Sequence, residues 1–528
     1  MDTPMSAAST IAGSRTPSAF FASSAAPSIN IEDFETSDTP RPISDAENAV
    51  GSCLDEKKKE ARGVVDNIVE WDGYNDPECP RNWTTLKKGL MVLTTSGMIL
   101  SVSFGSSVFA PAEKVTAAQF GVPLIVMQLT VALWILGLFA GPVFFGPLSE
   151  IFGHLVPFWL STAGMAVFQL PIALGENVRT ILICRFFAGV FGSGTMAIVS
   201  GMYFELYEPT YRGVALGLSA ICINLGATIA PVAGSYLTYD ANWRWTAWTT
   251  LIIAGTLSFI GCFTVRETSS RMILRHKASR LRFETGNWAL HSRSEETRIN
   301  FHDITHRYLT KPVRMFVTEP ILIIVTLYLT LVYGTLYLSF QAFPIAFQQR
   351  GWPTTTSSLP FIAVILGILS AWTACSVFSL TWYKERSLLA KGSPVPEWRL
   401  PPMILGGVLL PPSLFWFAWS GNVHWISQVL AMYFIGLTLM LIFISGIAYI
   451  VDVYQIHSNS AMSIHIIVRS LISSSFPLFA TIMYDNLGVD WATSVLAFLC
   501  IIMVPAPILF YRLGHKIRSW SRFSFSTA

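Results

Sequence analysis

The sequence predicts an all-α, polytopic membrane protein with twelve transmembrane helices in two six-helix halves. Hydrophobic residues make up 52% of the 528 positions and charged residues only 13%, and the mean hydropathy is +0.51. A soluble domain usually carries about 25% charged residues. Apolar runs of about twenty residues recur along the chain, and each is long enough to cross a hydrocarbon core of about 30 Å. One long polar stretch divides these runs into two groups of six.

The chain divides into five predicted parts. Residues 1–84 are rich in Ser, Thr, Pro, Ala and acidic residues, a composition that cannot bury a core, so we expect a disordered cytosolic tail. Residues 85–265 form the N-terminal six-helix half, and residues 266–318 form a cytosolic central loop. Residues 319–512 form the C-terminal six-helix half, and residues 513–528 form a cytosolic C-terminal tail.

The twelve predicted spans follow the apolar runs, which lie near residues 88–110, 124–148, 155–174, 178–205, 213–237, 245–265, 320–340, 358–381, 402–420, 425–450, 460–484 and 491–511. Six spans, a hydrophilic hinge and six further spans are typical of a secondary transporter.

The distribution of Lys and Arg predicts the orientation. Eleven basic residues lie between Arg266 and Arg314, whereas the loops on the opposite side hold only Lys114, Arg179, Arg244 and Arg350. Positive residues favour the cytosolic side, so both termini and the central loop are predicted to be cytosolic. We expect a multi-pass protein of the plasma membrane, with the vacuolar membrane as the alternative.

The fourth and fifth spans contain the most informative pattern. Arg185 lies seven residues inside the fourth span, about 10 Å deep. A charge at that depth costs roughly 2.5–3.5 kcal/mol unless it faces water or a partner. The fifth span carries Asn224 and then Gly226, Pro231 and Gly234, where small residues permit close helix packing and the proline predicts a bend. A polar route through the bundle is therefore predicted.

Ionisable residues within the second half are few. His465 and Arg469 lie four residues apart in the eleventh span, so they share one helix face. A histidine in a membrane titrates near neutral pH and could carry a proton; the alternative is a hydrogen-bonded interhelical contact. For Arg469 the alternative to a place in the polar route is snorkelling toward lipid phosphate.

The seventh span is rich in aromatic residues, among them Tyr333, Tyr337 and Phe343. Such residues can form packing contacts, or they can form a cavity wall suited to flat, apolar ligands. Gln341 and Pro344 interrupt the aromatic run near its end, and we prefer the cavity wall.

Several function classes are excluded by the sequence. There is no hydrolase triad, and no P-loop pattern that would bind ATP for direct energy coupling. The seven cysteines are scattered without zinc or disulfide spacing. We therefore expect no catalytic residues, metal, cofactor or nucleic-acid partner. The expected partners are a small-molecule substrate, a proton gradient and the lipid bilayer, and the expected state is a monomer.

The loop after the second span carries the first family resemblance. It reads GPLSEIFGH from Gly146 to His154 and resembles the signature loop G-x-L-x-D-R-x-G-R-R of the major facilitator superfamily. Gly146 and Gly153 match, and Glu150 replaces the aspartate, but the basic positions are lost. In that family the acid and the bases latch the inner gate. The alternative is simply a tight turn.

Further stretches extend the resemblance. Arg185 matches the fourth-span pattern R-x-x-x-G, and Glu205, followed by Arg212, stands where relatives carry an acid. GATIAPVAG, from Gly226 to Gly234, resembles a fifth-span motif of drug:proton antiporters. From about residue 70 onward the chain resembles the twelve-span fungal multidrug and polyamine exporters, through NWRWTAW (242–248), PEWRLPP (396–402) and YIVDVY (449–454).

The resemblance implies a proton-coupled efflux pump for an amphipathic drug, toxin or endogenous secondary metabolite. The alternative is a polyamine or nutrient permease. Relatives often carry a glutamate where this chain has Gln341, and a glutamine can neither take a proton nor pair with a cation. The deep ionisable residues Arg185, His465 and Arg469 disfavour cations, so neutral or anionic aromatic compounds are expected in preference to polyamines.

Overall fold

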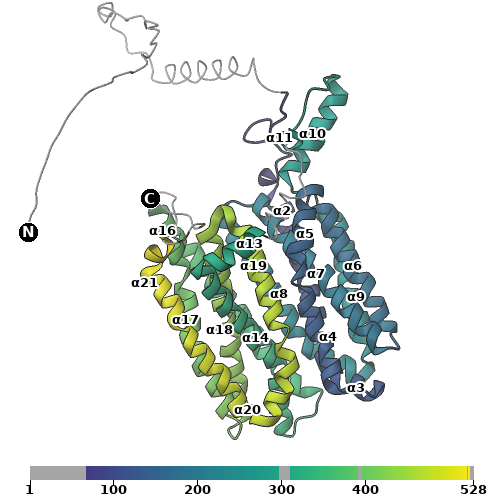
Figure 1. The fold of residues 1–528 in the computed structure, drawn as a ribbon, viewed down its shortest axis with the longest axis vertical. Helices are drawn as coiled ribbons and strands as arrows, with labels where there is room; N and C mark the ends of the chain where they lie inside the picture. The colour runs from purple at the N-terminus through teal and green to yellow at the C-terminus, as the bar shows by residue number, and fades with distance from the viewer. Residues whose placement is uncertain (1–66, 297–309, 390–394, 520, 522, 524–528) are drawn as a thin grey trace, which may run out of the picture. The chain divides into compact units, whose positions relative to one another are not determined.

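The computed structural model describes residues 67–296, 310–389, 395–519, 521 and 523, and its regular elements in these ranges are helices (Figure 1). The N-terminal half comprises α2 (Thr85–Ser107), α3 (Glu113–Phe120), α4 (Leu124–Gly137), α5 (Ala140–Phe152), α6 (Leu155–Leu174), α7 (Val178–Leu206), α8 (Pro209–Tyr236) and α9 (Arg244–Thr264). The central segment contains α10 (Ser270–Thr285), α11 (Arg293–Glu296) and α13 (Lys311–Thr318). The C-terminal half comprises α14 (Pro320–Gln349), α15 (Phe361–Phe378), α16 (Lys384–Leu389), α17 (Pro401–Trp419), α18 (Trp425–Tyr454), α19 (Ser458–Ser473), α20 (Phe476–Met503) and α21 (Pro505–Ser519).

Eleven helical segments in the described residues are long and apolar enough to cross a membrane. The last one, Ser458–Ser519, contains 62 residues, which as a straight helix would be about three times longer than a hydrocarbon core. Gly488 interrupts it with φ +73° and ψ 166°. The segment therefore makes two crossings, and the total of twelve agrees with the count expected from the sequence.

Glycines set the close helix contacts within each half. A Cβ atom on Gly226 of α8 would collide with the carbonyl oxygen of Leu100 in α2, and one on Gly234 with that of Val108, the residue that follows α2. In the C-terminal half, a Cβ atom on Gly367 of α15 or Gly436 of α18 would collide in the same way with the facing helix. The small-residue pattern thus brings backbones together in both halves, as expected for helices in a membrane. Pro231 lies inside α8, which continues to Tyr236.

The two halves pack against each other along several helix pairs. α8 contacts α15 and α18, and α4 contacts α19 and α20. We call the end of the bundle with residues 146–154 the motif end and the opposite end the far end. The chain passes between α5 and α6 at the motif end, and between α6 and α7 at the far end.

Residues 67–84 belong to the predicted tail, and the structure packs them against the central segment. The Val69 backbone N–H donates to the His291 carbonyl oxygen at 2.8 Å. Lys277 of α10 is buried and pairs with Asp76 at 3.0 Å and Asp72 at 2.8 Å. This segment is thus fixed by a parallel backbone contact and a buried ion pair. Residues 1–66 of the predicted tail lie outside the described residues.

Candidate functional site

A cavity of about 340 Å³ lies between the two halves and extends inward from the motif end. Its walls come from α5, α7 and α8 of the first half and from α18 and α19 of the second. At the motif end it is lined by Gly146, Glu150, His154, Glu205 and Arg271, and in its depth by His465 and Arg469. Its volume falls within the usual range for small-molecule pockets.

His465 and Arg469 lie one helical turn apart on α19 at the deep end of this cavity. Both are buried, at 0% and 4% exposure. Neither His465 nitrogen has a hydrogen-bond partner among the described residues, and the same is true of Arg469 Nε. The Arg469 guanidinium carbon lies 4.4 Å from the centre of the Tyr333 ring and 5.4 Å from that of Phe443. Its position argues against snorkelling to lipid phosphate.

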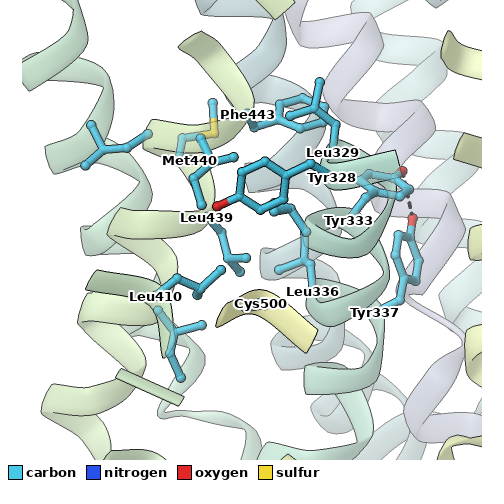
Figure 2. Close-up of a cluster of buried hydrophobic side chains, with 14 of the residues drawn as sticks. Tyr328, Leu329, Tyr333, Leu336, Tyr337, Leu410, Leu439, Met440, Phe443 and Cys500 are labelled. Carbon is cyan, nitrogen blue, oxygen red and sulfur yellow. Dashed lines mark hydrogen bonds between the residues drawn. The ribbon is translucent and has the colours of Figure 1, made fainter. Parts of the chain in front are cut away.

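Tyr333 and Tyr337 connect this deep end to the first half. Their hydroxyl groups are 3.3 Å apart, and Figure 2 shows the dashed line between them. The Tyr337 hydroxyl also lies 2.9 Å from Ser106 Oγ of α2. Asn224 of α8 lines a small void next to Tyr333. These contacts join the two halves next to the deep end of the cavity, and neither tyrosine is part of its lining.

Gln341 takes part in a second contact between the halves. Its side-chain oxygen accepts a hydrogen bond from Thr481 of α20 at 2.8 Å. Thr481 Oγ1 in turn accepts a hydrogen bond from Gln128 of α4. Gln341 is therefore placed in a polar chain across the interface rather than in the lining of the 340 Å³ cavity.

Phe343 lies among other aromatic residues of the second half. Its ring centre is 5.3 Å from that of Phe361 and 4.7 Å from that of Phe417, and the side chain is 2% exposed. The cavity lining does not include it. In this conformation its contacts are those of a packing residue.

Arg185 is buried in the first half, nearer to the far end of the bundle than the cavity is. Its Nη1 donates a 2.6 Å hydrogen bond to the carbonyl oxygen of Gly105. The guanidinium lies 4.6 Å from the ring centre of Phe109 and 5.3 Å from that of Trp134. The cavity lining does not include Arg185, so its access to a polar route would require another conformation.

Glu113 is a buried acid that the sequence analysis missed. It is 4% exposed, and its Oε1 has no hydrogen-bond partner among the described residues. It interacts electrostatically with Arg185. The predicted first span ended near residue 110, which left Glu113 in a loop, whereas the helical segment continues through α3 to Phe120. Residues 113–120, which follow Pro111, contain no glycine or proline, and this stretch could have predicted that the helical segment continues past residue 110.

The loop at the motif end is held by Glu267, a second residue that the sequence patterns did not single out. The Glu267 carboxylate accepts hydrogen bonds from the backbone N–H groups of His154 and Leu155, both at 3.0 Å. His154 Nδ1 lies 2.8 Å from Thr268 Oγ1. Gly153 has φ +80°, and a Cβ atom there would lie 2.7 Å from Glu267 Oε2. The glycine is thus required by both its conformation and this contact.

Glu205 and Arg212 have separate partners near the same loop. The Ser270 hydroxyl donates to Glu205 at 2.7 Å. Arg212 donates to the Tyr207 carbonyl oxygen at 3.3 Å and lies over the Phe204 ring at 4.2 Å. A direct ion pair between Glu205 and Arg212 is therefore not formed in this conformation.

The second half also has an ionic contact at the motif end of the bundle. Arg399 Nε lies 2.9 Å from Asp452 at the end of α18, and the Tyr383 hydroxyl donates to the same carboxylate oxygen at 3.0 Å. Together with Glu267 in the first half, this contact fixes the helix ends around the cavity entrance. Within the described ranges, no cluster of three or more His, Cys, Asp or Glu residues could hold a metal ion.

Comparison with known families gives a match over most of the chain. The profile of the Major Facilitator Superfamily matches residues 95–477. The chain is 42% identical over 486 residues to a citrinin biosynthesis cluster MFS transporter of Monascus ruber, covering 91% of this chain and 96% of that protein. It is 41% identical to an ascochitine biosynthesis cluster MFS transporter of Didymella fabae, covering 87% of this chain and 90% of that protein.

A multidrug transporter of Candida glabrata is 36% identical, with 87% of this chain and 80% of that protein covered. Among solved structures, a proton:xylose symporter superposes with a TM-score of 0.59 at 16% identity, covering 82% of this chain and 96% of that chain. The human organic anion transporter MFSD10 gives 0.57 at 14% identity, covering 80% and 100%. At these identities the structural matches establish the fold.

Proposed function

The chain belongs to the major facilitator superfamily, and we propose that it is a proton-coupled efflux pump for an amphipathic small molecule. The substrate is a drug, a toxin or a secondary metabolite of the producing organism. The relatives named for citrinin and ascochitine biosynthesis clusters, together with the multidrug transporter, support export. These relatives are named as transporters, in agreement with a non-enzymatic role.

The observation that carries this proposal is the amphipathic cavity between the two halves. Its walls combine apolar side chains such as Ile223 and Met462 with the polar groups of Ser219, His465 and Arg469. A ligand with an apolar body and one polar group would satisfy both kinds of wall. Tyr337 and Gln341 make contacts that join the two halves on the other side of the cavity. A compound is therefore proposed to enter from the motif end and to leave through the far end after the halves rearrange.

The proton route is proposed to involve Glu113, Arg185 and His465. Glu113 and His465 can each gain or lose a proton, whereas an arginine keeps its charge. The through-space electrostatic attraction between Glu113 and Arg185 supports a coupled exchange, because protonation of the acid would weaken its attraction to the guanidinium. The chain is proposed to act as a monomer in the plasma membrane, with the vacuolar membrane as the alternative.

The orientation is tested with an impermeant thiol reagent on intact cells. Both termini and the motif end are proposed to be cytosolic. Cys53 and Cys79 should then react only after the cells are permeabilised. Ready labelling of either cysteine in sealed cells would contradict the proposed orientation and indicate the opposite one.

The export function is tested by deletion of the gene and a panel of labelled compounds. Loss of an exporter should raise the intracellular level of its substrate, and the intact gene should restore the original level. Selective retention of spermidine would favour a polyamine exporter. Reduced uptake of a nutrient in the deletion strain would instead favour a permease.

A further inference from the structure

We propose that the deep end of the cavity is an anion-binding subsite formed by Arg469 and His465, and that the preferred substrate carries a carboxylate on a flat apolar body. This inference rests on the proposed export function and specifies the chemical class of the exported compound.

The first support is a cation without a protein counter-ion. Arg469 is 4% exposed, its Nε has no hydrogen-bond partner, and none of the ion pairs among the described residues includes it. His465, on the same face of α19, has two unpartnered ring nitrogens. Buried polar groups are nearly always hydrogen-bonded, and a buried charge without a partner is strongly disfavoured. A ligand carboxylate would supply the missing acceptors to both side chains.

The second support is the way in which the guanidinium is held. Tyr333 and Phe443 are stacked, with ring centres 6.2 Å apart and an interplanar angle of 19°, and both rings lie near the Arg469 guanidinium. Aromatic faces attract a cation but provide no acceptor for its N–H groups. The two rings thus hold the guanidinium in place while its planar set of N–H donors stays able to bind a carboxylate. Figure 2 shows Tyr333 and Phe443 among the buried hydrophobic side chains of the second half.

The third support is the separation of charges along the cavity. Its acidic lining residues, Glu150 and Glu205, lie near the ends of α5 and α7 at the motif end, together with His154 and Arg271. Arg469 lies eleven residues along α19 from Ser458, about 16 Å from that end. Neither glutamate is therefore placed to neutralise Arg469. An anionic substrate would bind with its carboxylate in the deep end and its apolar body toward Ile223 and Met462.

The test measures binding of 2-naphthoate and the neutral 2-naphthamide to the purified full chain by equilibrium dialysis. The two ligands share the same ring system and differ in charge. The intact protein should bind the carboxylate at least about tenfold more tightly, as expected for charge-assisted hydrogen bonds. Arg469→Ala should reduce this preference to less than about threefold while changing the affinity for the amide little.

Arg386→Ala is the matched control. The guanidinium of Arg386 also lies over an aromatic ring, 4.2 Å from the centre of Trp382, but Arg386 does not line the cavity. This control should keep the full preference. If Arg469→Ala does not elute as a folded protein, Arg469→Met preserves the side-chain length and provides the same comparison.

Equal binding of both ligands to the intact protein would overturn the subsite, as would absence of binding of either ligand or an unchanged preference in the Arg469 variants. The proposed function is judged separately by compound accumulation in the deletion strain. Selective binding through Arg469 without any transport defect in that strain would contradict export and leave the anion subsite supported.

Discussion

Arg185 Nη1 donates a 2.6 Å hydrogen bond to the carbonyl oxygen of Gly105 and thereby connects α7 to α2. The same guanidinium lies against the rings of Phe109 and Trp134. Its other nitrogens, Nε and Nη2, have no hydrogen-bond partner among the described residues. Arg185 thus combines a structural contact between helices with unused donor capacity in a buried position.

Arg185→Ala should abolish efflux while the protein still reaches the membrane, and Arg185→Lys should restore little. A lysine keeps the charge but lacks the planar fork that contacts Gly105 and two aromatic rings at once. The measurement is substrate efflux normalised to the amount of protein at the cell surface. Near-normal efflux by the alanine variant would leave Arg185 with a structural role alone.

Glu113→Gln should uncouple transport from the proton gradient. Glutamine preserves the size of the side chain but cannot exchange a proton, so its interaction with Arg185 no longer depends on protonation. In proteoliposomes, a pH gradient should no longer drive accumulation, whereas exchange of labelled for unlabelled substrate should continue. Ala118→Gln introduces the same residue at an exposed position of the same α3 helix and serves as the control. Full stimulation of Glu113→Gln by the gradient would exclude Glu113 as the proton-coupling acid.

Gln341→Glu should shift resistance toward cationic drugs. A carboxylate can still accept the hydrogen bond from Thr481, so the contact between the halves can be retained, while the new negative charge favours cations. The measurement is the ratio of resistance to a cationic and a neutral drug of similar size. Gln341→Leu is the comparison variant, since it removes the acceptor without adding charge. A resistance ratio that is the same for all three proteins would exclude position 341 as a charge selector.

The segment 67–84 should detach from α10 in acid. Burial tends to raise the pKa of Asp76, but hydrogen bonds from the backbone of Asp72 and Glu78 and from Lys277 outweigh it and hold the pKa below its usual value. Because the pKa is lower in the packed state, the stabilisation is present above the unfolded pKa of about 3.9 and is lost as the pH falls through the packed-state value. The protection factor of the Val69 amide, which is its intrinsic exchange rate divided by the observed rate, should fall over that range.

Two substitutions distinguish the loss of this ion pair from a general unfolding of the protein in acid. Lys277→Met should give fast exchange of the Val69 amide already at neutral pH, because it leaves Asp76 buried without its cation. Arg275→Met, at a more exposed position of α10, should leave that exchange slow. Equal protection of the Val69 amide in the Lys277 and Arg275 variants would mean that the ion pair does not hold the segment.

Patterns along the chain are enough to predict the class of protein, the twelve crossings and the family. Hydrophobic length and the positions of charged residues are local properties, so the limits of most spans, the break near Gly488 and the small-residue face of α8 can be read along the chain. Motif residues such as Gly146 and Gly153 could be recognised for the same reason.

Contacts between polar groups from distant parts of the chain could not be predicted in this way. Tyr337 reaches Ser106 across 231 positions, and Glu267 reaches the backbone of His154 across 113 positions. No periodicity within one helix encodes such contacts, because they depend on the rotation and depth of two helices relative to each other. For the same reason the sequence could propose Arg185, Phe343 and Arg469 together, whereas packing places only Arg469 in the lining of this cavity.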